Sequence, residues 1–182
     1  MLQVTLPTNF KAARIESDEH TAILRQMQSE IEAIRFDAGD AQIGLPVKLK
    51  VHDSIFVPLA KWAMLVTGNY RCVQKDAAQS IKDAVHTDID ASREIYQWVH
   101  GLCVNLGASR DDLVPFDKYA AAAMTLVRPS SAARALFAGA PNIERVDRLV
   151  QLIAAQKGRS SEVIDRTVAL VDGWLERNRR KA

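Results

Sequence analysis

The stretch Thr87–Gly107, TDIDASREIYQWVHGLCVNLG, decides the fold. Apolar residues recur along it at intervals of three and four, the spacing of one face of an α-helix. These residues are Ile95, Val99, Leu102 and Leu106. Thr87 and Asp90 resemble a capping box at the start of a helix, and Gly107 is typical of its end. We therefore predict an amphipathic helix over this stretch.

Helical spacing continues on the N-terminal side of this stretch. Ser17 or Asp18 is a suitable N-cap for a first helix. Its predicted buried stripe consists of Ile23, Met27, Ile31 and Ile34. A second helix is predicted from near Asp53 to Tyr70, and a short one near residues 75–85. Pro58 fits the second helix only if it lies in the first turn.

Helices are also predicted on the C-terminal side. Ser109 and Asp112 resemble another capping box, and residues 118–127 are rich in alanine. Pro129 then interrupts the chain. Beyond it, apolar spacing predicts a short helix after Ser130 and two longer ones. The first of these contains Ile143, Val146, Val150 and Ile153, and the second contains Val163, Thr167, Leu170 and Trp174.

Two segments near the N-terminus alternate between apolar and polar residues, as strands do. Leu2 to Leu6 is one, and Pro46 to His52, with its alternating valines, leucine and lysines, is the other. We expect these two strands to pair. The fold class predicted is mainly α, a helical bundle with a short two-stranded β element. We divide the chain into an N-terminal strand–helix–strand segment, residues 1–52, and a helical domain, residues 53–182.

Composition favours a cytoplasmic globular protein. The 182 residues carry a net charge of +2, which does not indicate a nucleic-acid partner. We interpret the basic residues after Trp174 as positive charges that interact favourably with the negative, C-terminal end of a helix dipole. No apolar run approaches the ~20 residues of a membrane span. Cys72 and Cys103 lie within apolar helical patterns, so we expect buried, reduced thiols.

Common cofactor motifs are absent from the sequence. It lacks the G-x-G-x-x-G turn of dinucleotide-binding proteins, and the pair Gly39 and Gly44 is read as part of a turn. The four histidines are dispersed and form no H-x-x-x-H pair, so we predict no metal site. No single motif in the sequence therefore identifies the chemistry of the chain.

One longer pattern resembles a known family. Arg128-Pro129-Ser130-Ser131 is followed by Gly139-Ala140-Pro141-Asn142-Ile143-Glu144, then by Val146-Asp147 and an apolar helix. This order resembles the C-terminal domain of ketopantoate reductases, which is helical and has the 6-phosphogluconate dehydrogenase C-terminal-domain-like fold. The resemblance covers roughly residues 53–174. It implies that the domain binds a keto-acid substrate and forms a homodimer.

The resemblance also implies site residues. The family carries W-x-K-x-x-x-N, with the lysine as general acid and the asparagine as a substrate and cofactor contact. Here Trp62 is followed by Met64 and Gly68 at those positions, while Lys61 and Asn69 lie one residue away. A helix turns by about 100° per residue, so these two can serve only if the helix is locally re-registered.

Further down the chain, the resemblance assigns substrate binding to two serines and an acidic residue. Ser130 and Ser131 match the family's serine turn, and Glu144 matches its acidic residue if one residue is inserted. The alternative is that these residues cap helices, with Ser130 or Ser131 starting one helix and Glu144 in the first turn of the next.

The family's nucleotide-binding domain has no counterpart in the sequence. We therefore expect the chain to bind no cofactor alone. It would use NADP only together with a Rossmann domain supplied from elsewhere. The predicted function is the C-terminal domain of a ketopantoate-reductase-like oxidoreductase, inactive by itself. The alternative is a non-enzymatic helical interaction module, because Met64 and Gly68 replace the family's polar pair.

Overall fold

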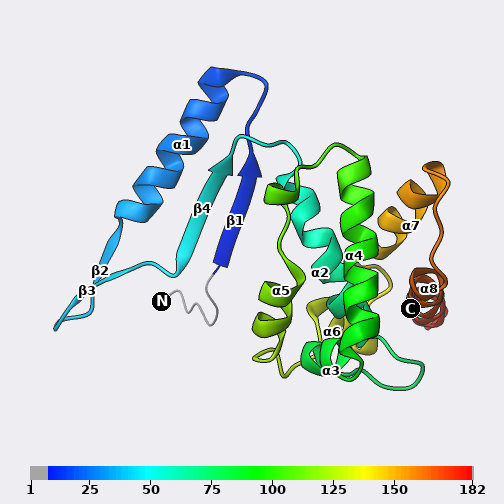
Figure 1. Ribbon diagram of the computed structural model, residues 1–182. Coiled ribbons are helices and arrows are strands. Elements are labelled where there is room, and N and C mark those ends of the chain that lie inside the picture. Colours follow the sequence, from blue (N-terminus) through cyan, green and yellow to red (C-terminus); the bar gives the residue numbers. More distant parts are fainter. Residues whose placement is uncertain (1–7, 182) are drawn as a thin grey trace. The chain divides into compact units, whose positions relative to one another are not determined.

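The computed structural model describes residues 8–181 and divides the chain into two compact units. The strand unit spans Met1–Pro58 and the helical unit spans Leu59–Ala182. The boundary thus falls a little later than the predicted one at His52. Within the described residues the structure is mainly helical, with eight α-helices (Figure 1).

The strand unit is built on a two-stranded parallel sheet. Its elements are β1 (Thr8–Ala13), α1 (Asp18–Ala33), β2 (Arg35–Asp37), β3 (Gln42–Gly44) and β4 (Val47–His52). β1 and β4 pair in parallel, with Phe10 opposite Leu49. The predicted strand β4 is confirmed, and its partner is β1. The strand predicted at residues 2–6 lies outside the described residues.

Helix α1 packs on β4 with a different face from the one predicted. Ser17 caps α1 as expected, accepting a hydrogen bond from the backbone of His20. Thr21 is buried at the start of the helix, and the Gln28 side chain accepts a hydrogen bond of 2.8 Å from the Val51 amide. In contrast, three residues of the predicted stripe are exposed: Ile23 (53%), Met27 (46%) and Ile34 (46%). The prediction was wrong because α1 joins the strand unit and not a bundle core.

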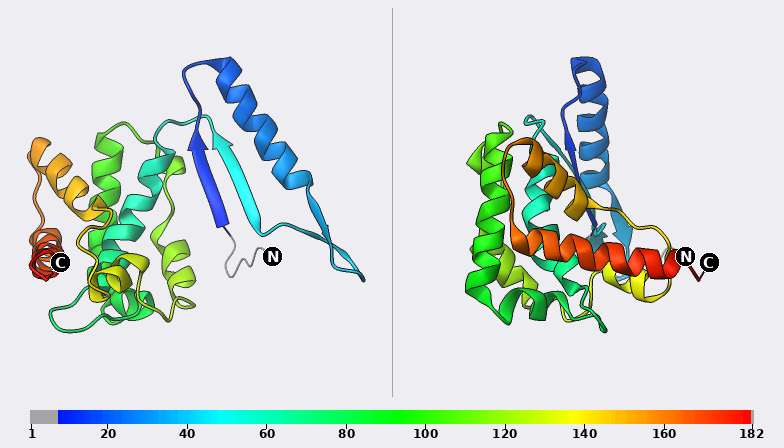
Figure 2. Two further views of the ribbon diagram at one scale, coloured as in Figure 1. Left: turned by 180° about the vertical axis from the view of Figure 1, so that it is seen from behind. Right: turned by 90° about the vertical axis from the view of Figure 1, so that its right-hand side faces the viewer.

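The helical unit contains seven of these helices. They are α2 (Trp62–Met64), α3 (Ile81–His86), α4 (Ile89–Asn105), α5 (Phe116–Ala123), α6 (Ser131–Phe137), α7 (Val146–Gln156) and α8 (Glu162–Arg179). α4 is the predicted central helix, but its N-cap is Asp88 and not Thr87, which ends α3. The capping box at Ser109 and Asp112 is present and opens a 3-10 turn, Arg110–Asp112. Figure 2 shows α8 running across the direction of α4.

The helix predicted from Asp53 to Tyr70 is instead a series of short helical segments. It begins only at a 3-10 turn, Val57–Lys61, which places Pro58 in its first turn. α2 follows, then a π-helical turn at Leu65–Asn69 and a 3-10 turn at Tyr70–Cys72. The prediction of one continuous helix was wrong, and the irregular part coincides with the residues that resemble a catalytic motif.

The core of the helical unit forms around α4. Tyr96, Val99, Leu102 and Cys103 are all fully buried on this helix. Cys72 and Cys103 are buried and unpaired, as predicted, and burial raises the pKa of the Cys103 thiol to about 11. The Tyr96 ring stacks on Tyr119 of α5, with ring centroids 5.3 Å apart. α4 therefore joins α5 and the π turn into one packed core.

Three charged side chains, of which only Asp147 is buried, connect the start of α7 to α8. Arg145 donates two hydrogen bonds to the fully buried carboxylate of Asp147, at 2.9 and 3.0 Å, and a third to Asp172 on α8 at 2.5 Å. A buried carboxylate is stable only when such partners satisfy it.

Within the described residues, no helix is long and apolar enough to cross a membrane.

Candidate functional site

The π turn changes the direction of the side chains that follow it. The amide of Tyr70 bonds to the carbonyl of Leu65, five residues back, where an α-helix would bond four residues back. Such a turn accommodates about one extra residue. Asn69 therefore points roughly where residue 68 would point on an uninterrupted α-helix. The helix is therefore locally re-registered at Asn69 by about one residue.

Gly68 lies at the tightest contact of this turn. A Cβ atom placed on Gly68 would lie 1.9 Å from the hydroxyl oxygen of Tyr119 and 3.2 Å from Ile81. The Tyr119 hydroxyl occupies this space and donates a hydrogen bond of 3.1 Å to the Met64 carbonyl. Burial raises the pKa of Tyr119, so it remains a neutral donor. No side chain can replace Gly68 unless Tyr119 moves.

Ser130 connects the π turn to α6. Its hydroxyl donates a hydrogen bond of 2.7 Å to the Asn69 carbonyl and accepts one of 3.1 Å from the Ala133 amide. The residue is 3% exposed. Ser130 is therefore the N-cap of α6 and holds the backbone of Asn69, while its neighbour Ser131 is exposed.

Tyr70 connects the same turn to the start of α7. Its hydroxyl donates a hydrogen bond of 2.6 Å to the Glu144 carbonyl and accepts one of 2.9 Å from the Val146 amide. Burial raises the pKa of Tyr70 to about 12. The Glu144 side chain itself is exposed. Backbone contacts thus bring Asn69, Ser131 and Glu144 to one region of the helical unit, which we call the asparagine site.

Lys61 is not part of this region. It ends the first 3-10 turn and is exposed, eight residues before Asn69. At 1.5 Å per residue, that separation is roughly 12 Å along the helix axis. No hydrogen bond or ion pair of its side chain occurs within residues 8–181. The π turn follows Met64, so it does not bring Lys61 to the family's lysine position.

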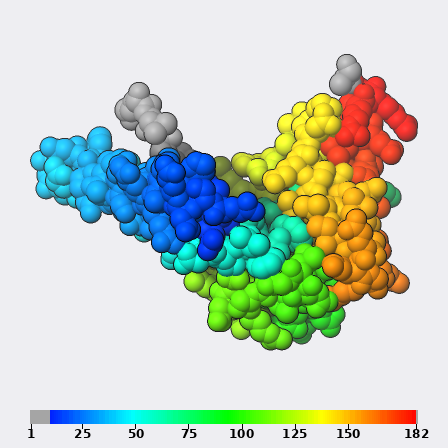
Figure 3. Space-filling view, turned by 90° about the horizontal axis from the view of Figure 1, so that it is seen from above, coloured from blue at the N-terminus to red at the C-terminus, as the bar shows by residue number. Residues whose placement is uncertain are grey.

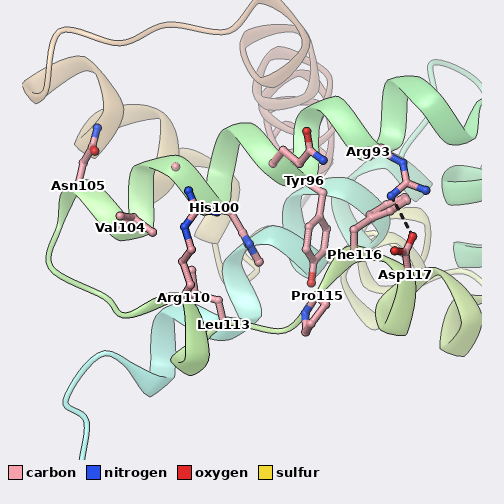
Figure 4. A pocket seen from close by; sticks show the side chains of 12 residues that line it. Arg93, Tyr96, His100, Val104, Asn105, Arg110, Leu113, Pro115, Phe116 and Asp117 are labelled. Carbon is pink, nitrogen blue, oxygen red and sulfur yellow. Dashed lines mark hydrogen bonds and ion pairs between the residues drawn. The ribbon is translucent and has the colours of Figure 1, made fainter.

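A second feature is a cleft of about 720 Å³ on the outer side of α4 (Figure 4). It lies between α4 and the chain that leads from the 3-10 turn at Arg110 into α5. Polar side chains line it together with Tyr96, Val104, Leu113, Pro115 and Phe116. The polar residues are Arg93, Gln97, His100, Asn105, Arg110 and Asp117. We call it the α4 cleft, and none of the residues of the asparagine site lines it.

Of the two arginines that line the α4 cleft, one has an ion-pair partner and the other has none within the described residues. Arg93 forms an ion pair of 2.9 Å with Asp117 and lies over the Phe116 ring. Arg110 has no ion pair within the described residues. Burial lowers the pKa of His100, and the charge of Arg110 lowers it further, while the Val114 carbonyl opposes both. His100 is thus neutral at pH 7, and Arg110 carries the unmatched charge.

The sequence reasoning missed the α4 cleft. A usable signal was present, because Arg93, Gln97 and His100 recur at intervals of four and three and therefore share one side of the helix. It also missed Arg71, a half-buried cation that donates a hydrogen bond of 2.7 Å to Ser92. Burial lowers the pKa of Arg71.

Comparison with known proteins identifies no relative. No family model matches the chain, and neither a curated protein nor a solved structure matches it. In the described residues, no group of three or more His, Cys, Asp or Glu side chains could hold a metal ion.

The contact between Gly68 and Tyr119 makes a testable prediction. We expect Gly68→Ala to destabilise the protein by about 3 kcal/mol, because the new methyl group overlaps a buried hydroxyl. The double variant Gly68→Ala/Tyr119→Phe removes that hydroxyl and should recover part of the loss. Urea unfolding followed by circular dichroism measures both.

Gly173 provides the matched control, since a Cβ there meets nothing within 4 Å on helix α8. Gly173→Ala should stabilise the protein by roughly 0.5–1 kcal/mol through helix propensity. Equal stabilities of Gly68→Ala and its double variant would contradict the close contact.

Proposed function

We propose that the helical unit is the substrate-binding domain of a ketopantoate-reductase-like oxidoreductase. The observation that carries this proposal is the π turn at Leu65–Asn69, which overlaps the segment resembling W-x-K-x-x-x-N. Because the turn accommodates about one extra residue, we propose that Asn69 takes the role of the asparagine in that pattern. Asn69 is half-buried, and within residues 8–181 its side-chain amide makes no hydrogen bond. It is therefore free to bind a ligand.

The asparagine site offers groups suited to a 2-keto acid. The Asn69 amide can donate a hydrogen bond to either the keto oxygen or the carboxylate of such a substrate. The exposed hydroxyl of Ser131 can then donate a hydrogen bond to whichever of these two groups Asn69 does not bind. Glu144 can accept a hydrogen bond from a hydroxyl of the substrate. Ser130 and Tyr70 support the site without binding the substrate, because their hydroxyls hold the backbone carbonyls of Asn69 and Glu144 in place.

Reduction of a ketone also needs a hydride donor and a proton donor. Met64 stands where the family has its lysine, so the asparagine site lacks a side-chain acid at that position. Nicotinamide cofactors would have to come from another domain. The β1–α1 connection, residues 14–17, contains no glycine, so its backbone does not fit the close approach of a dinucleotide phosphate. The proposed role of this chain alone is therefore substrate binding.

Titration of the full chain with ketopantoate tests the proposal. In amide-detected NMR, ketopantoate should shift the side-chain amide of Asn69 and the backbone amides around Ser131. Asn69→Ala should weaken binding at least tenfold, whereas Gln156→Ala, which removes an exposed amide from α7, should not change it. The proposal is wrong if millimolar ketopantoate shifts neither region, or if Asn69→Ala binds as well as the unaltered protein.

The alternative function, a protein-interaction module, is favoured by the surface of the strand unit. β2 and β3 form a hairpin in which all six residues are exposed, with Phe36 opposite Ile43. The hairpin is the tip of this unit in Figures 1 and 3. A two-stranded hairpin is marginally stable in water without a partner. Together with Met27 of α1 and Ile34, the residue after α1, it presents exposed apolar side chains of the kind that bind proteins.

A homodimer through this surface would depend on protein concentration. We expect sedimentation velocity between roughly 1 and 100 µM to show a monomer–dimer equilibrium, which Phe36→Ser together with Ile43→Ser shifts toward monomer. Val127→Ser, which removes an exposed valine from the helical unit, should leave the equilibrium unchanged. A strict monomer over the whole range would contradict this dimer.

A further inference from the structure

We propose that the α4 cleft is a second binding site, for a small organic monocarboxylate whose carboxylate pairs with Arg110. This site is separate from the asparagine site and does not depend on the proposed function. Its volume of about 720 Å³ lies in the range of small-molecule pockets, roughly 300–1,000 Å³.

Charge selects an anion with a single negative charge. Two arginines and one aspartate line the cleft, so its formal charge is +1 with neutral His100. Arg93 is already matched by Asp117, at 2.9 Å. Arg110 is the remaining cation, and a guanidinium binds a carboxylate through two parallel hydrogen bonds. A second negative charge on the ligand would meet Asp117 without a further free cation.

The placement of Arg110 favours a bound anion. The capping box of Ser109 and Asp112 fixes the 3-10 turn that carries it, so the backbone of Arg110 is anchored to the cleft. In Figure 4, the Arg110 side chain extends from that turn toward His100 on α4. The Arg93–Asp117 pair lies at the other end of the cleft. Gln97 and Asn105, both exposed on α4, add uncharged donors between and beside these charges.

The walls of the cleft suit the carbon body of the ligand. Leu113, Pro115 and Phe116 line the cleft together with Val104, and the buried ring of Tyr96 packs edge-to-face against the Phe116 ring behind them, with ring centroids 5.3 Å apart. Tyr96 is held by its hydroxyl, which donates a hydrogen bond of 2.9 Å to the Val114 carbonyl, and by its stacking on Tyr119. A wall that is fixed before binding reduces the entropy lost when a ligand binds. A ring-sized apolar body next to the carboxylate fits these features.

Four matched probes test this site on the full chain by amide-detected NMR titration. They are 3-phenylpropionate, its neutral alcohol 3-phenylpropanol, its amine 3-phenylpropylamine, and phenyl phosphate. We expect 3-phenylpropionate to shift the amides of residues 97–105 and 110–117, and to bind at least tenfold more tightly than the alcohol. The amine should not bind, and phenyl phosphate should bind more weakly than the carboxylate at pH 7.5.

Two variants locate the carboxylate. Arg110→Gln should weaken 3-phenylpropionate binding at least tenfold, because it removes the unmatched charge while keeping a donor. Arg134→Gln, which removes an exposed arginine from α6, should not change binding. Both residues are exposed, so circular dichroism should show the native fold in each variant. Equal binding of acid and alcohol, shifts confined to other regions, or unchanged affinity of Arg110→Gln would overturn the proposal.

Discussion

The contact of the Tyr119 hydroxyl with the backbone at Gly68 is the constraint on which the helical unit depends. It fills the space of a Cβ atom and donates a hydrogen bond to the Met64 carbonyl, next to the π turn. Tyr119 is itself stacked on Tyr96 of α4. The contact therefore ties α5 and α4 to the irregular segment Leu65–Cys72. A helix with one extra residue in a turn is costly on its own, so its neighbours must stabilise it.

Two hydroxyl groups connect the π turn to the C-terminal half of the helical unit. Ser130 binds the backbone of Asn69 and starts α6, and Tyr70 binds the backbone on both sides of Arg145 just before α7. Arg145 then joins the buried Asp147 to Asp172 on α8. Ser130, Tyr70 and Asp147 are buried and each of them is hydrogen-bonded, as stability in a low-dielectric interior requires. The same contacts that hold the helices together also place Asn69 and Glu144.

The sequence was sufficient for the helical class, for α4 and the helices after Pro129, and for the buried thiols. Periodicity reports which residues share a face, but it does not say what the face contacts. The stripe of Ile23 and Met27 was therefore placed in a core that α1 does not join. The π turn could not be predicted from spacing, because it depends on Tyr119, some fifty residues later. The α4 cleft could be predicted only in part, because the spacing of Arg93, Gln97 and His100 marks one side of α4, whereas Arg110 reaches α4 only through tertiary structure.

The proposed function depends on the direction of Asn69, and that direction depends on the π turn. The turn can be observed in solution through the hydrogen bond that defines it. In a uniformly ¹⁵N,¹³C-labelled, deuterated protein, through-hydrogen-bond coupling should connect the amide nitrogen of Tyr70 with the carbonyl carbon of Leu65. Coupling of the Tyr70 nitrogen to the Val66 carbonyl carbon instead would show an ordinary α-helix, with Asn69 turned away from the asparagine position, and would contradict the account.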